Sequence, residues 1–115
     1  MKKVLVIVQD SPFNTLRTSE AFRMAMGMIL SGNPVSVLLV GDGVWSLLPL
    51  QSERIGRPSI QTYLEYFPKV HISLFADTAA LTERGLTALP GGTEAIPHEK
   101  ALALISESEV VIPFR

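Results

Sequence analysis

Three short, largely apolar runs constrain the fold of this chain most: Val4–Val8, which is continuous, and Pro34–Val40 and Val70–Ala76, which have few polar residues. A strand that is covered on both faces reads as a continuous apolar run, whereas a half-exposed strand alternates apolar and polar residues. Each run is followed by turn-forming residues and then by a helical pattern. Buried strands that alternate with helices are typical of a parallel sheet with helices on both faces.

The first helical pattern begins near Thr15 or Leu16 and ends before Gly32, a residue type suited to the left-handed position after a helix. Its Met24 and Met28 lie on a different side from the stripe expected to face the sheet, so its last two turns are apolar nearly all round. A helix sunk in the core explains this pattern, but a helix at a subunit interface explains the second stripe better. The sheet-facing stripe consists of Phe22, Ala25, Met26 and Ile29.

The second half of the chain continues the alternation. Its expected elements are a helix over residues 60–67, the strand Val70–Ala76, a helix ending at Gly85, an irregular stretch with a short edge strand over 86–96, a helix after Pro97 through Ala101, Leu102 and Ile105, and a last strand Val110–Phe114. The whole pattern predicts an α/β fold, a three-layer α/β/α sandwich around a mostly parallel sheet of four or five strands. We expect the strand order second, first, third, fourth, in a single domain over residues 1–115.

The composition excludes several classes of partner. The net charge is −1 and the basic residues are scattered, so no basic patch for nucleic acid or an anionic membrane surface is expected. No apolar run approaches the roughly 20 residues that a membrane-spanning helix needs. The opening MKKVLVIVQDS is similar to a signal peptide, but its apolar run stops at Val8 and polar Gln9 follows. We interpret it as a strand and expect the protein in the cytoplasm.

Acidic residues follow three of the predicted strands at the point where each ends. Because the carboxyl ends of parallel strands share one edge of the sheet, their side chains are expected to line one crevice. One interpretation is turn and capping chemistry, for which Asp, Asn, Ser and Thr are the favoured residues. The other is a ligand site in which carboxylates hold Mg²⁺, with a phosphate at nearby helix N-termini. The candidate ligand-binding residues are Asp10, Ser11, Asn14, Thr15, Asp42 and Asp77.

Other motifs are weaker. The segment GDGVWS at 41–46 imitates a dinucleotide fingerprint, but Ser46 replaces the third glycine and Pro49 breaks the following helix, for which Asp42 is the expected N-cap. His71 falls inside a predicted strand and His98 follows Pro97, and neither is accompanied by a nucleophile motif. We therefore assign no catalytic residue, no metal ligands and no cofactor.

Three segments together carry a family resemblance: SPFNT after the first strand, GDGVWSLLP after the second, and ADTAALTERGL at the third strand's end. Their order and spacing resemble the DsrE/DsrF-like family, which includes the sulfur-relay proteins TusB, TusC and TusD. The resemblance covers nearly the whole chain. It implies a flavodoxin-like parallel sheet and assembly into a dimer, trimer or hexamer of identical or related subunits.

The resemblance also makes the residue after the third strand informative. In the family's catalytic members a persulfide-carrying cysteine lies eight residues before the glycine of an Arg-Gly pair, and the same count back from Gly85 reaches Asp77. A carboxylate cannot accept sulfane sulfur as a thiolate does, and this chain has no cysteine. The resemblance thus implies a non-catalytic binding or assembly subunit. The alternative is a ligand-, metal- or phosphate-binding protein or an enzyme that uses Asp10, Asp42 and Asp77.

Overall fold

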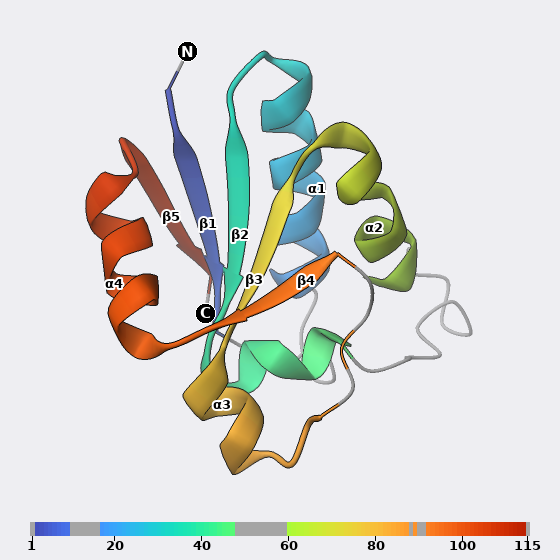
Figure 1. Cartoon of the computed structure of the whole chain (residues 1–115). Helices are drawn as coiled ribbons and strands as arrows, with labels where there is room; N and C mark the ends of the chain where they lie inside the picture. The colour runs from blue at the N-terminus through green and yellow to red at the C-terminus, as the bar shows by residue number, and fades with distance from the viewer. Residues whose placement is uncertain (1, 10–16, 48–59, 88, 90–91, 115) are drawn as a thin grey trace.

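The computed structural model describes residues 2–9, 17–47, 60–87, 89 and 92–114, and its described strands form one sheet (Figure 1). Every neighbouring pair of strands in it is parallel. The sheet order is β4-β3-β2-β1-β5. The strands are β1 (Val4–Val8), β2 (Val35–Leu39), β3 (Ser73–Asp77), β4 (Thr93–Ile96) and β5 (Val110–Phe114).

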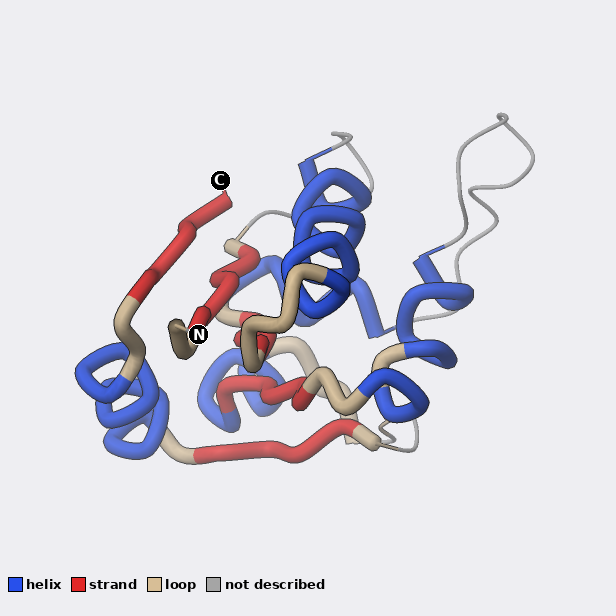
Figure 2. The backbone as a smooth tube through the Cα atoms, turned by 90° about the horizontal axis from the view of Figure 1, so that it is seen from above, coloured by secondary structure: helices blue, strands red, loops and turns tan. Residues whose placement is uncertain are grey.

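The helices form layers on the two faces of this sheet, as the sequence predicted. Seen from above, the sheet separates α4 from α1 and α2 (Figure 2), while α3 and η1 lie at the carboxyl edge of the strands (Figure 1). No helix in the described part of the chain is long and apolar enough to cross a lipid bilayer. The helices are α1 (Arg17–Leu30), α2 (Ile60–Tyr66), α3 (Thr78–Glu83) and α4 (His98–Glu107), with the 3₁₀ helices η1 (Gly41–Leu47) and η3 (Pro68–Val70).

The predicted strand order is wrong, because β2 and not β1 lies beside β3. The chain steps from β1 to β2, β3 and β4 in one direction, and the connection through α4 then returns it to the other side of β1. A right-handed crossover that reverses its direction across the sheet places its helix on the opposite face. The sequence did not reveal where this reversal occurs, since either order satisfies the handedness rule.

The larger part of the core lies between the sheet and the pair α1 and α2. Phe22 of α1 is fully buried, and its ring meets the ring of Phe67 edge to face with centroids 5.2 Å apart. The ring of Tyr63 packs on it in the same manner at 6.1 Å. This confirms the predicted sheet-facing stripe of α1, and it shows that Tyr63 and Phe67 pack against the same core.

The second apolar stripe expected on α1 is only partly present. Met28 is half-buried and packs against the core, together with Met26 and Ile29. Met24 is 40% exposed. The helix ends at Leu30, and Gly32 follows with φ of +89°, the left-handed conformation predicted for it. The residues near its expected start, Thr15 and Leu16, lie outside the described residues.

The start of the third strand differs from the prediction, and His71 does not lie in a strand. Val70 ends η3, and His71 takes a left-handed conformation with φ of 63°. The N–H of Ile72 then donates to the carbonyl of Phe67 at 2.9 Å, which closes the turn before β3 begins at Ser73. Pro68 favours this tight turn because its ring fixes φ near the value that the first position of a helix requires.

The helix predicted through Ala101, Leu102 and Ile105 is present as α4, but only some of these apolar residues face the sheet. Ala101 is buried and Leu104 packs beside it, whereas Leu102 is 51% and Ile105 37% exposed. Pro97 precedes the helix as its N-cap residue. The predicted short edge strand is present as β4. The cluster beneath α4 is small and includes Leu5, Ile7, Leu38, Ile96 and Ala101 as its buried members.

Candidate functional site

The candidate site lies where β3 passes directly into α3. Asp77 is both the last residue of β3 and the N-cap of α3, with the extended φ of −68° and ψ of 121° typical of that position. Its Oδ1 accepts a hydrogen bond from the backbone N–H of Ala79 at 3.3 Å. The carboxylate of Asp77 therefore satisfies one of the unpaired donors of the first turn, in agreement with the capping interpretation.

Two backbone hydrogen bonds that depart from the regular helical pattern end α3 at its C-terminus. The N–H of Gly85 donates to the carbonyl of Thr82 at 3.2 Å, and that of Leu86 to the carbonyl of Leu81 at 3.0 Å. Gly85 has φ of +66°, a conformation that glycine adopts without strain. These bonds form a Schellman arrangement, with Gly85 at the helix end, where the sequence predicted it. The short helix thus has a defined beginning and end.

Arg84 connects α3 to η1 across the carboxyl edge. Its Nη2 and Nε donate to the same oxygen of Asp42, at 2.9 and 3.1 Å. Its Nη1 also donates to the carbonyl of Ala80 at 3.1 Å, so the guanidinium is held on both sides. Asp42 is the second residue of η1, whereas the sequence placed it before that helix as the N-cap. The carboxylate of Asp42 is therefore engaged in an ion pair.

The packing around Gly43 accounts for the glycine-rich start of η1, so no bound nucleotide is needed to explain it. A Cβ at this position would clash with the backbone carbonyl of Val8, so only glycine lets η1 lie against the end of β1. The N–H of Gly43 donates to the carbonyl of Val40 at 2.8 Å and is not directed at a phosphate. Further along η1, Ser46 is fully buried, and its Oγ has no hydrogen-bond partner among the described residues.

The structure describes only part of the predicted acidic crevice. Asp42 and Asp77 both lie at the carboxyl edge, as predicted, and Arg84 from α3 pairs with Asp42. Within residues 2–9, 17–47, 60–87, 89 and 92–114, no three Asp, Glu, His or Cys side chains are close enough to hold a metal ion. Four candidates lie outside the described residues: Asp10, Ser11, Asn14 and Thr15.

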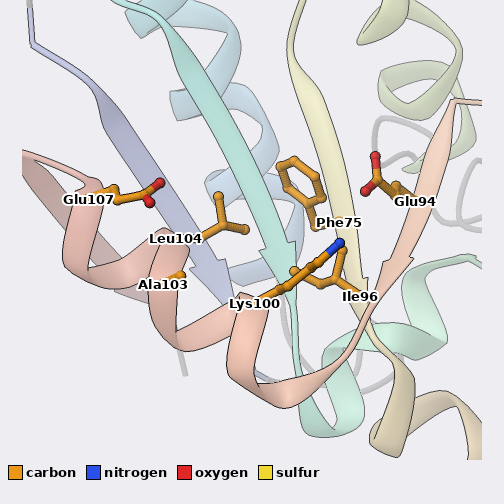
Figure 3. Close-up of a pocket in the computed structure, with 7 residues that line it drawn as sticks. All are labelled: Phe75, Glu94, Ile96, Lys100, Ala103, Leu104 and Glu107. Atoms are coloured by element: carbon orange, nitrogen blue, oxygen red, sulfur yellow. The ribbon is translucent and has the colours of Figure 1, made fainter.

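A groove that the sequence did not predict lies between α4 and the strands β3 and β4 (Figure 3). It has a volume of about 240 Å³. Phe75 of β3 and Leu104 of α4 give it an apolar floor, while Lys100 extends across it toward β3 and β4. Glu94 and Glu107 lie on its two sides. Phe75 is the one residue whose apolar side chain could have indicated this groove. In the sequence it is indistinguishable from the other apolar residues of a buried strand.

Comparison with known proteins identifies the family. The model of the DsrE/DsrF-like family matches residues 2–114. The crystal structure of the YchN protein from E. coli superimposes with a TM-score of 0.84 at 20% sequence identity, covering 99% of this chain and 100% of that one. Among curated proteins, none matches the chain. The fold is therefore that of YchN, and the match over nearly every residue shows that this chain belongs to the DsrE/DsrF-like family.

Proposed function

We propose that this chain is a non-catalytic binding or assembly subunit related to the sulfur-relay proteins. The observation that carries the proposal is the role of Asp77, which caps α3 at the junction where the family's catalytic members have a persulfide-carrying cysteine. A capping carboxylate has its oxygen directed at the first turn of its own helix and contributes to the stability of the fold.

The chemistry of sulfur transfer supports the same conclusion. A persulfide forms when a thiolate attacks a sulfur donor, and the terminal sulfur is later released to an acceptor. The chain contains no cysteine, and its four methionines have thioethers without an ionisable proton. A contribution to sulfur transfer would therefore be indirect, through a cysteine-bearing partner or a small ligand held at this edge.

The contacts that hold α3 and η1 at the junction are consistent with a binding or assembly role. Arg84 ties α3 to η1 through Asp42, and the close approach of Gly43 to Val8 fixes η1 on the sheet. Such an edge offers a partner a surface of defined shape, which lowers the entropy lost on binding. We include in the proposal a single domain, a location in the cytoplasm, and association with copies of itself or related subunits.

The alternative, a metal or phosphate site built on the acidic edge, has less support. The Oδ1 of Asp42 already accepts hydrogen bonds from Arg84, and the Oδ1 of Asp77 accepts one from the backbone of α3. Asp10, the third acid of that hypothesis, lies outside the described residues. The described part of the edge therefore favours capping and ion pairing over cation binding.

The direct experiment compares the unmodified chain with an Asp77→Cys variant. Both are incubated with a persulfide donor and weighed intact by mass spectrometry. The unmodified chain should keep its mass, whereas the variant should gain one sulfur that is lost on reduction, because a thiolate at the start of a helix is stabilised by the helix dipole. A reducible sulfur adduct on the unmodified chain would contradict the proposal.

A further inference from the structure

We propose that the groove between α4 and the strands β3 and β4 binds a small zwitterion with an apolar body, of which a free aromatic amino acid is the simplest example. The groove is lined by neither Asp42 nor Asp77. This binding site therefore goes beyond the proposed function and concerns a different part of the molecule. Two features of the groove support the assignment: its uncovered apolar floor and the opposite charges at its border.

The floor of the groove is the part of the sheet that α4 leaves uncovered. Register partners in neighbouring parallel strands direct their side chains to the same face of the sheet. One such row consists of Ile7, Leu38, Phe75 and Glu94. The first two are buried in the cluster beneath α4, whereas Phe75 is half-buried and Glu94 is exposed. The cover that α4 provides therefore ends between β2 and β3, and the ring of Phe75 is left partly open.

One side of α4 forms the wall of the groove. It contributes Lys100, Ala103, Leu104 and Glu107, and their spacing of three and four residues places them on one side of the helix. Leu104 and Phe75 offer apolar surface from the helix and from the sheet (Figure 3). The volume of about 240 Å³ is below the range of about 300–1,000 Å³ that holds drug-sized ligands, so the occupant is a smaller molecule.

Lys100 and Glu94 are the charged groups that remain available to a ligand. The third charged group, Glu107, has its Oε2 3.7 Å from the Nζ of Lys3. Within the described part of the chain, Lys100 and Glu94 form no ion pair, either with each other or with another residue. Both side chains are exposed, and Lys100 extends across the groove toward the strand that carries Glu94 (Figure 3). A cation and an anion therefore border the same apolar floor.

This charge pattern selects the class of ligand. An apolar carboxylic acid would pair with Lys100 but would meet the like charge of Glu94, and an apolar amine would do the reverse. A molecule with both a carboxylate and an ammonium group pairs with both side chains, while its apolar body covers Phe75. An aromatic body suits the ring of Phe75, because aromatic rings pack favourably edge to face or offset.

The first experiment titrates the isotope-labelled chain with phenylalanine, phenylpropionate and phenethylamine, which share a ring and differ in their charged groups. We expect phenylalanine to shift the backbone NMR signals of β3, β4 and α4 with a Kd of about 0.1–10 mM, the range for so small a ligand. Each of the other two should bind at least about threefold more weakly, because it loses one surface ion pair and meets one like charge.

The second experiment reverses the two charges one at a time. Glu94→Lys should make phenylpropionate bind more tightly than phenylalanine, and Lys100→Glu should make phenethylamine bind more tightly than phenylalanine. Both residues are exposed, so these substitutions should leave the fold intact. The matched controls are Glu65→Lys in α2 and Lys69→Glu in η3, two exposed residues that do not line the groove. They should leave the order of the three ligands unchanged.

Three outcomes would overturn the inference. The absence of signal shifts with all three ligands up to about 50 mM, well above the expected Kd, would show that the groove does not bind them. Equal affinities that the charge reversals leave unchanged would show adsorption of a ring without recognition of charge. Shifts centred on Asp42 and Asp77 would place the ligand at the carboxyl edge. None of these results depends on the persulfide experiment, so the two proposals fail separately.

Discussion

The two faces of the sheet differ in how completely they are covered. On the face of α1 and α2, Phe22 and Phe67 are fully buried and pack edge to face within a large cluster. On the face of α4, a single helix covers a small cluster and leaves Leu102 and Ile105 exposed beside a groove. The comparison indicates that the α1 face provides most of the stability, while the α4 face contributes less and leaves apolar side chains open to solvent.

The largest effect is expected from Phe22→Ala. Its ring is fully buried and contacts Phe67 and Tyr63, so its loss should lower the free energy of unfolding by about 3–5 kcal/mol. Chemical denaturation, with far-UV circular dichroism as the signal, measures this change. A loss below about 1 kcal/mol would mean that the α1 face does not carry the stability assigned to it.

A smaller effect is expected at Gly43, where a Cβ would clash with the carbonyl of Val8. Gly43→Ala should destabilise the chain by about 1–3 kcal/mol, because η1 must move away from β1. The matched control is Gly27→Ala in α1, where nothing lies within 4 Å of the added Cβ. That substitution should leave stability unchanged or raise it by up to about 1 kcal/mol, since alanine favours a helix. Equal effects at both glycines would refute the close-packing argument.

Next in size is the cap of α3. Asp77→Ala removes the acceptor for the N–H of Ala79 and should lower the free energy of unfolding by about 1 kcal/mol. Asp77→Asn keeps an acceptor oxygen and should cost less. Thermal unfolding of the three proteins gives the ranking. An alanine variant with unchanged stability but lost partner or ligand binding would favour a functional role for Asp77 over the structural one.

The smallest effect is expected at Leu102 on the α4 face. Leu102→Ala should change the unfolding free energy of the isolated chain by less than about 0.5 kcal/mol, because its side chain is half exposed. The measurement is made at dilution, where association does not contribute. A loss comparable to that at Phe22 would show that Leu102 is buried in its own chain, and the contrast between the two faces would disappear.

The layers of the fold could be predicted from the sequence, because buried strands and glycine helix ends leave local patterns. Val4–Val8, Gly32 and Gly85 have the predicted roles. The strand order could not, since it depends on where the chain reverses direction across the sheet. The exposure of Leu102 could not be predicted either. Leu104, two residues later, is equally apolar, and it is the residue that packs against the sheet.

At the candidate site, the sequence placed Asp42 and Asp77 correctly at the carboxyl edge but not their partners. The capping bond from Ala79 to Asp77 is local and follows from residue type. The ion pair between Arg84 and Asp42 joins residues that are 42 positions apart, so no local sequence pattern predicts it. The groove beside Phe75 is lined by residues of β3, β4 and α4 that are distant in the sequence, so no local pattern indicates it.

The most direct test of the account is one native mass spectrum of the unmodified chain after treatment with a persulfide donor. We predict that every chain keeps its unmodified mass, because the chain lacks a thiol and Asp77 serves as a helix cap. A subunit one sulfur heavier, returning to its original mass on reduction, would contradict the proposed non-catalytic role.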